Sequence, residues 1–221
     1  MRKLYYWWLC PLSRKVRVML GEARLPHDVL LVNPWDLRED FLQLNPSGIL
    51  PVFIEEHNIT FCDSQAICEY LDESYALGLI GRDPLRRAEV RRLVAWFDQK
   101  FYNDVWQAII FEKSLKSKCN LGNPDAKIIR EGNILLTQHL DYITSLLTMH
   151  DWLAGEALTL ADITAAAHLS CVDYLGHIFW ANYPQASDWY ARVKSRPSFR
   201  PLLKDRVPAL IPSPHYSNLD F

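Results

Sequence analysis

The sequence predicts a mixed α/β first half followed by an all-helical second half. Short apolar and aromatic runs alternate with helical patterns in residues 1–75, whereas apolar residues at helical spacing dominate the remainder. The segment 76–84 contains two glycines and a proline, which is typical of a linker. We therefore expect one domain at residues 1–76 and a second at residues 84–221.

The first half is expected to contain four strands and three helices in the order βαβαββα. A parallel βαβ unit followed by an antiparallel hairpin forms a small mixed sheet with helices on its faces. Glu56-His57-Asn58 is the expected hairpin connection. The expected strands are 4–8, 28–32, 52–55 and 59–62, and the expected helices are 13–23, 35–44 and 64–75.

The second half shows helical periodicity without convincing strand patterns. Thr159-Leu160-Ala161-Asp162 resembles a capping box with Asp in place of Glu, and it predicts the start of an apolar helix. Five prolines fall in the last 25 residues and predict an extended tail, which is either disordered or docked onto the body or a partner. The expected helices are 84–111, 125–147, 160–175 and 187–195.

Composition limits the classes of function. The chain has 221 residues, is 49% hydrophobic and has a net charge of −2, which excludes a disordered chain and argues against nucleic-acid binding. Residues 1–75 hold 7 basic and 11 acidic side chains, and residues 76–221 hold 17 and 15, so an electrostatic partner is expected on the helical half. No run approaches the roughly 18 apolar residues of a membrane span. No signal peptide develops after the start, so we expect a cytoplasmic protein without a membrane partner.

The five cysteines differ in their expected setting. Their odd number and wide spacing exclude a disulfide framework, and no Cys or His pair has the spacing of a zinc site. Cys10 alone lies between an expected strand and an expected helix, where backbone N–H groups and the nearby Arg14 and Lys15 would lower the pKa of a thiol. The alternative is a buried cysteine in a tight turn.

Two further segments could hold a ligand. Pro51 directly precedes a strand and is a candidate for a cis peptide bond, which would leave the Leu50 N–H and C=O free for an extended, peptide-like ligand. An ordinary turn is the alternative. Asp63 and Ser64 precede a helix, where Ser64 is the expected N-cap. The same two side chains could also hold a ligand's ammonium and carboxylate.

These segments together resemble the soluble glutathione transferase superfamily, and the resemblance covers essentially the whole chain. It rests on Cys10-Pro11-Leu12-Ser13, on Asn45-Pro46-Ser47-Gly48-Ile49-Leu50-Pro51-Val52, on Asp63-Ser64 and on residues 67–71 and 158–163. The resemblance implies a thioredoxin-like first domain, glutathione as co-substrate and a homodimer. The reaction it implies is glutathione conjugation or thiol transfer to a hydrophobic electrophile.

The resemblance also assigns roles to single residues. Cys10 matches the catalytic cysteine of omega- and beta-like members, and Ser13 of the same motif is the second candidate catalytic residue. Leu50 and Pro51 match the backbone clamp on the cysteinyl unit of glutathione. Asp63 and Ser64 match the acidic-Ser pair that holds its γ-glutamyl group. The family's catalytic tyrosine would fall near Leu9, and many members have a basic residue where Ile49 stands. Trp106 and Phe111 match a helix that lines the substrate cleft.

A second resemblance points to a different role. Residues 92–98, 165–171, 188–192 and 195–201 and the ending 214–221 are similar to the FzlA-type branch of alphaproteobacterial proteins. That branch has the transferase fold but is associated with binding the division protein FtsZ. The candidate docking surface is the C-terminal tail with a cluster of arginines, and the cluster could instead belong to a dimer interface or to a solvated helix face. The cluster comprises Arg82, Arg86, Arg87, Arg91 and Arg92.

Overall fold

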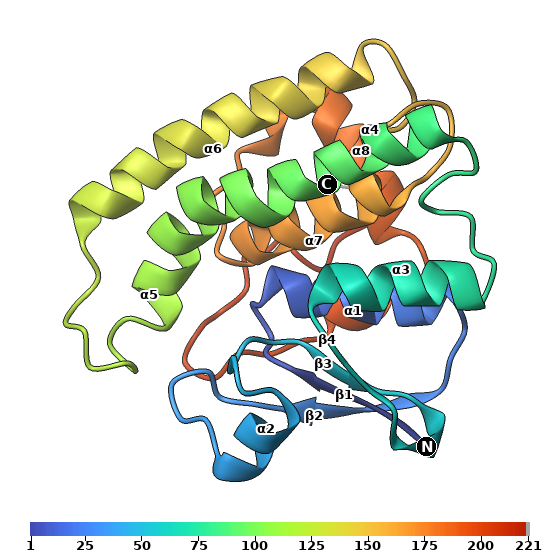
Figure 1. Cartoon of the computed structure of the whole chain (residues 1–221). Coiled ribbons are helices and arrows are strands. Elements are labelled where there is room, and N and C mark those ends of the chain that lie inside the picture. The colour runs from blue at the N-terminus through green and yellow to red at the C-terminus, as the bar shows by residue number, and fades with distance from the viewer. Residues whose placement is uncertain (220–221) are drawn as a thin grey trace.

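A four-stranded mixed sheet forms the base of the first half (Figure 1). The structure is a computed structural model, and it describes residues 1–219. The strand order is β2-β1-β3-β4, with β1 parallel to β2 and antiparallel to β3, and β3 antiparallel to β4. The strands are β1 (Arg2–Tyr6), β2 (His27–Leu31), β3 (Val52–Ile54) and β4 (Thr60–Cys62). The predicted order βαβαββα is confirmed, with the first two strands beginning earlier than expected.

Three helices accompany the sheet, and the start of one of them corrects an expectation. Helices α1 (Pro11–Glu22) and α3 (Ser64–Ser74) lie between the sheet and the helical half, and α2 (Glu39–Leu44) lies on the other side of the sheet (Figure 1). The helix expected from residue 35 begins only at Glu39, since its N-cap Arg38 has an extended backbone with ψ of 153°. Trp35, ahead of the helix, packs edge-on against Trp7 with ring centroids 6.3 Å apart. The hairpin connection Glu56–Asn58 forms a short 3-10 turn, η1.

The second half consists of helices stacked above α1 and α3, with α7 nearest to them (Figure 1). The helix expected over 84–111 is one helical run, but its second part, η2, is a π-helix. Every residue of α7 is buried. The elements are α4 (Pro84–Ala95), η2 (Trp96–Phe111), α5 (Glu112–Ser114), α6 (Ala126–Leu147), α7 (Leu160–Tyr174), η3 (Trp180–Asn182), α8 (Pro184–Lys194) and α9 (Arg200–Leu203).

The capping box at the start of α7 is confirmed. Asp162 is fully buried, and its Oδ2 accepts the Thr159 N–H at 2.8 Å while its Oδ1 accepts the Leu153 N–H at 2.8 Å. The Trp189 indole also donates to Oδ1 at 3.0 Å. Because one carboxylate satisfies groups from three segments, Asp162 fixes the start of α7 as well as the approach of α8.

The C-terminal tail is docked onto the body. Tyr216 is fully buried, and its hydroxyl donates to the Leu202 carbonyl at 3.1 Å and accepts from Arg14 Nη1 at 3.0 Å. The Ser213 N–H donates to the Tyr174 carbonyl at 2.8 Å. Of the two alternatives for the tail, docked or disordered, these contacts favour the docked one for residues up to 219. Residues 220–221 of the predicted ending lie outside the described residues.

Neither a membrane helix nor a metal cluster is found in the described part of the chain. No helix there is long and apolar enough to cross a membrane. No three His, Cys, Asp or Glu side chains within residues 1–219 are grouped so that they could hold a metal ion. His168, Cys171 and Asp173 are fully buried, and the Cys171 thiol donates to the Leu9 carbonyl at 3.4 Å, so this group packs the core.

Candidate functional site

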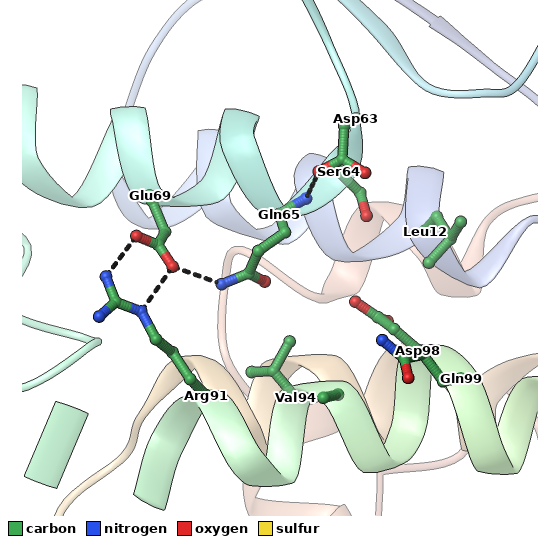
Figure 2. Close-up of a pocket in the computed structure, with 10 residues that line it drawn as sticks. Leu12, Asp63, Ser64, Gln65, Glu69, Arg91, Val94, Asp98 and Gln99 are labelled. Carbon is green, nitrogen blue, oxygen red and sulfur yellow. Dashed lines mark hydrogen bonds and ion pairs between the residues drawn. The ribbon is translucent and has the colours of Figure 1, made fainter. Parts of the chain in front are cut away.

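The predicted site residues line two neighbouring hollows. We call the first the Cys10 cavity: its volume is about 180 Å³, and its lining includes Trp7, Cys10, Leu12, Leu50, Tyr102 and Trp106. We call the second the Asp63 cavity: its volume is about 340 Å³, and its lining includes Leu12, Asp63, Ser64, Gln65, Asp98 and Gln99 (Figure 2). Leu12 lines both hollows and therefore stands between the predicted catalytic cysteine and the predicted acidic-Ser pair.

Cys10 forms the N-cap of α1. Its Sγ accepts the Ser13 N–H at 3.4 Å and lies 3.9 Å from the Leu50 carbonyl oxygen, and the residue is 9% exposed. Burial raises the pKa of the Cys10 thiol, and the hydrogen bonds from Ser13 and Leu12 offset this only in part. The expectation of a lowered thiol pKa is therefore wrong, because desolvation outweighs the helix N-terminus.

The two basic side chains next to Cys10 serve other partners. Arg14 is fully buried and donates to the Trp8 carbonyl at 2.5 Å and to Ser170 Oγ at 2.7 Å, besides Tyr216. Lys15 is also fully buried and pairs with Asp98. Arg14 is therefore held by Trp8, Ser170 and Tyr216, and the charge of Lys15 is neutralised by Asp98, so neither side chain activates the thiol.

Ser13 lies buried in the first turn of α1. Its N–H is bonded to Cys10 Sγ, whereas its Oγ has no hydrogen-bond partner among the residues that the structure describes. A buried hydroxyl without a partner is unfavourable by about 1–3 kcal/mol. The Ser13 hydroxyl is thus available to donate a hydrogen bond next to Cys10, the N-cap of α1.

The segment before β3 presents the backbone of Leu50. The Leu50–Pro51 peptide bond is cis, as the sequence indicated, and Gly48 has a φ of 68° that favours glycine. Asn45 holds the turn by donating from Nδ2 to the Ile49 carbonyl at 2.8 Å. The Leu50 N–H makes no hydrogen bond within residues 1–219. It remains available to an extended ligand in the Cys10 cavity.

Asp63, and not Ser64, is the N-cap of α3. Its Oδ1 accepts the N–H groups of Gln65 and Ala66 at 2.8 and 2.9 Å, and its φ is 74°. Ser64 is instead the first residue of the helix. The cap occupies one carboxylate oxygen, so the other oxygen and the Ser64 hydroxyl remain for a ligand in the Asp63 cavity (Figure 2).

The Asp63 cavity contains polar residues that the motifs did not indicate. Gln65 Nε2 donates to Glu69 Oε1 at 2.8 Å, and Arg91 holds both Glu69 oxygens at 2.8 and 2.6 Å (Figure 2). Asp98 bonds Lys15 and, at 3.0 Å, His168 Nε2. Glu69 and Arg91 lie on different helices, and no sequence spacing indicates that they are in contact. The Glu69–Arg91 pair could therefore not be predicted from the sequence. Asp98 could have been noticed as a carboxylate between apolar residues of one helix.

Burial and charge oppose each other at Asp98. Burial alone would raise the pKa of Asp98, but the Lys15 charge and the hydrogen bond from His168 outweigh it and lower the pKa. Burial lowers the pKa of His168, although Asp98 acts in the opposite sense. The site therefore has an ionised carboxylate at its wall and a neutral histidine behind it at neutral pH.

The arginine cluster is largely paired with carboxylates. Arg91 pairs with Glu69, Arg92 with Glu89 at 2.7 Å and Arg87 with Glu73 at 3.6 Å. Within residues 1–219, Arg82 and Arg86 make no ion pair with a carboxylate. The basic surface available to an acidic partner is thus smaller than the sequence suggested and is centred on the start of α4.

One of the two predicted cleft residues reaches the cavity. Trp106 lines the Cys10 cavity, and its indole donates to the Leu9 carbonyl at 2.7 Å. Tyr102 stacks on Trp106 with ring centroids 4.6 Å apart and lines the same cavity. Phe111 is not among the lining residues. The wall on the helical side is therefore aromatic, which suits an apolar ligand.

Comparison with known proteins finds relatives over the whole chain. The glutathione S-transferase N-terminal domain matches residues 4–80, and the glutathione S-transferase C-terminal domain matches residues 108–197. FtsZ-localized protein A of Caulobacter vibrioides is 46% identical over 100% of this chain and 98% of its own length.

Two solved structures share the complete architecture. A glutathione S-transferase from Rhodospirillum rubrum F11 has a TM-score of 0.96 at 49% identity, and it covers 100% of both chains. FzlA from C. crescentus also has a TM-score of 0.96, at 47% identity over 100% of this chain and 99% of its own.

Proposed function

Because this chain belongs to the glutathione S-transferase family, we propose that it is a cytoplasmic protein of that fold that binds FtsZ and acts in cell division. The observation that carries the proposal is the full-length likeness to FtsZ-localized protein A. The features of the Cys10 site agree with a binding role, since burial raises the pKa of its thiol. Binding of FtsZ does not require a reactive thiol.

The start of α4 is the proposed docking surface, together with the tail. Arg82 and Arg86 keep their charges free of carboxylates, and Leu85 between them is 84% exposed. In the docked tail, Ile211 is 90% exposed. Two arginines without carboxylate partners, together with the exposed side chains of Leu85 and Ile211, suit a partner surface that is acidic and that also buries apolar area.

Co-sedimentation with FtsZ polymers at moderate salt tests this surface. We expect the wild-type chain to pellet with FtsZ and the double variant Arg82→Ala/Arg86→Ala to bind about fivefold more weakly, or ~1 kcal/mol. Arg91→Ala/Arg92→Ala is the matched control, because those charges are already paired with Glu69 and Glu89. Absence of wild-type co-sedimentation would overturn the proposal. Equal loss in both double variants would overturn the assigned surface.

Glutathione-dependent chemistry is the second candidate function, and the geometry of two segments favours it. The Leu50 N–H fits the backbone of a cysteinyl unit, and Asp63 with Ser64 fits the amino-acid end of a γ-glutamyl group. Bound glutathione would supply the reacting thiol. Cys10 and the Ser13 hydroxyl would then stabilise the glutathione thiolate beside the aromatic wall of the Cys10 cavity, or Cys10 would exchange with a glutathione disulfide and form a mixed disulfide.

Calorimetry with glutathione at millimolar concentration tests the second candidate. Asp63→Asn retains a good N-cap at a positive φ but removes the charge that would hold the ammonium group, so we expect binding to weaken about tenfold. Asp125→Asn is the control, because Asp125 caps α6 in the same way away from both cavities. No binding by the wild type would exclude this function. Cys10→Ala should abolish transferase activity but leave FtsZ binding intact.

A homodimer completes the proposal. The family resemblance implies a homodimer. Light scattering measures the mass of the protein in solution, independently of the FtsZ and glutathione experiments. We expect twice the mass of one 25.7 kDa chain. A single chain's mass at micromolar concentration would contradict the dimer without affecting either function.

A further inference from the structure

Lys113 has an unusual partner. Other lysines pair with carboxylates: Lys100 with Asp104 at 2.7 Å and Lys116 with Glu112 at 3.0 Å. Lys113 Nζ instead lies 2.7 Å from His177 Nε2, and it makes no ion pair with a carboxylate within the described residues. Lys113 lies on α5, is exposed as a whole residue although its amine is partly desolvated, and lines neither cavity.

A chain of hydrogen bonds fixes which nitrogen of His177 carries the proton. Asn133 Nδ2 donates to the Ile129 carbonyl at 2.7 Å, so its Oδ1 is turned toward His177 Nδ1, 2.7 Å away. An amide oxygen only accepts, so Nδ1 must carry the hydrogen. The lone pair of a neutral His177 is then on Nε2, where it faces Lys113.

The surroundings disfavour positive charge on both groups. Burial, followed by the charge of Lys113, lowers the pKa of His177 to about 4, so the ring is neutral at pH 7. Burial also lowers the pKa of Lys113. Glu112, the neighbouring carboxylate, is occupied by Lys116 Nζ and by the Asp125 N–H at 2.7 Å. Lys113 therefore has a proton acceptor at hydrogen-bond distance but no counter-ion.

We propose that Lys113 and His177 form an amine–imidazole dyad in which Lys113 Nζ is acylated by small acyl phosphates, such as acetyl phosphate, in preference to the other exposed lysines. The neutral amine donates one hydrogen to His177 Nε2 and attacks the acyl carbon with its lone pair. The new N–C bond forms as the C–O bond to phosphate breaks, and phosphate leaves with the electron pair. The proton lost by Nζ passes to His177 Nε2 and then to water. The product is an uncharged amide at Lys113.

Site-resolved labelling of the full chain tests this proposal. The protein is incubated with acetyl phosphate at a series of pH values, and initial acetylation rates of single lysines are measured by peptide mass spectrometry. A lowered amine pKa raises the neutral, nucleophilic fraction of the amine at neutral pH. We expect Lys113 to react roughly tenfold faster than Lys127, whose side chain is 82% exposed and lies 4.0 Å from Glu131. As the pH is raised, the rate of Lys113 acetylation should also reach its plateau at a lower pH than the rate of Lys127 acetylation.

His177→Gln removes the base but can retain a hydrogen bond, so it should slow the acetylation of Lys113 severalfold, whereas the part of the Lys113 rate that comes from the burial of its amine should persist. Lys127 in the same variant provides the internal control, and Lys100→Gln, which breaks a pair with Asp104 that does not involve Glu112, should leave the Lys113 rate unchanged. Unaltered thermal unfolding of each variant shows that the fold persists. Equal rates for Lys113 and Lys127 in the wild type, or a Lys113 rate unaffected by His177→Gln, would overturn the dyad.

Discussion

Single buried polar side chains connect the two halves of the molecule. Lys15 of α1 and His168 of α7 both bond Asp98 of η2, and Arg14 of α1 bonds Ser170 of α7. Buried ionisable groups of this kind couple the stability of the fold to pH. Removing one member leaves the others unsatisfied in the core.

His168 should make the fold less stable as the pH falls. Its pKa in the folded protein is lowered by burial, so below its ordinary value of about 6.5 the unfolded chain binds the proton first. The stability that depends on the neutral ring is therefore present above about pH 6.5 and lost below it. For one histidine this amounts to at most ~1.4 kcal/mol between pH 7.5 and 5.5.

Urea unfolding of His168→Gln at pH 7.5 and 5.5 measures this contribution. The variant should lose less stability between the two pH values than the wild type. His150→Gln is the comparison, because the His150 side chain is 45% exposed. If both variants keep the full wild-type pH dependence, another group causes it.

At the scale of elements, the tail and α1 depend on each other. The ring of Tyr216 packs against Tyr174 of α7 with centroids 5.0 Å apart, and its hydroxyl joins Arg14 of α1 to the Leu202 carbonyl of α9. Arg14 also lies 3.8 Å from Asp205. The tail thus covers a buried cation that would otherwise face water at the edge of α1.

Substitution of Tyr216 tests the docked tail. Tyr216→Phe leaves Arg14 and the Leu202 carbonyl each short of one partner and should cost about 1–2 kcal/mol of unfolding free energy. Tyr216→Ala adds the loss of a buried ring and should cost about 3–5 kcal/mol. The control is Ile211→Ala in the exposed part of the tail, expected within about 0.5 kcal/mol. Wild-type stability of Tyr216→Ala in denaturant titrations would show an undocked tail in solution.

At the scale of the whole molecule, the two halves share one core. α1 packs between the sheet and α7, and the Leu9 carbonyl accepts hydrogen bonds from Trp106 and Cys171 of the helical half. The first half by itself would expose the faces of α1 that bury Arg14 and Lys15. Helices α1 and α3, which cover one side of its four-stranded sheet, lie between that sheet and the helical half (Figure 1).

A fragment of residues 1–80, produced without the rest of the chain, should therefore be unfolded. Small domains bury too little surface to tolerate the loss of a covering layer. The amide region of a proton NMR spectrum should collapse to random-coil values for the fragment, while the full chain stays dispersed. In the full chain, tryptophan fluorescence and far-ultraviolet circular dichroism should report one common transition. A dispersed spectrum of the fragment would contradict the shared core.

The local chemistry of the sequence predicted the elements and several anchors of the site. Alternating and helical periodicities identified the order βαβαββα and the helical half, and Thr159 with Asp162 identified the start of α7, because caps and periodicity act over a few residues. The cis bond before Pro51 was predicted for the same local reason. The division into domains at 76 and 84 stays a prediction.

The electrostatics of the site depended on contacts between distant residues. Arg14 and Lys15 stand next to Cys10 in sequence, yet Ser170, Tyr216 and Asp98 take up their charges, and burial raises the pKa of the Cys10 thiol. Likewise, Glu69 neutralises Arg91 across two helices, and Asn133 sets the proton of His177. Charge and pKa depend on burial and on partners far along the chain, so the sequence identified which groups are present but the folded packing controls what each can do.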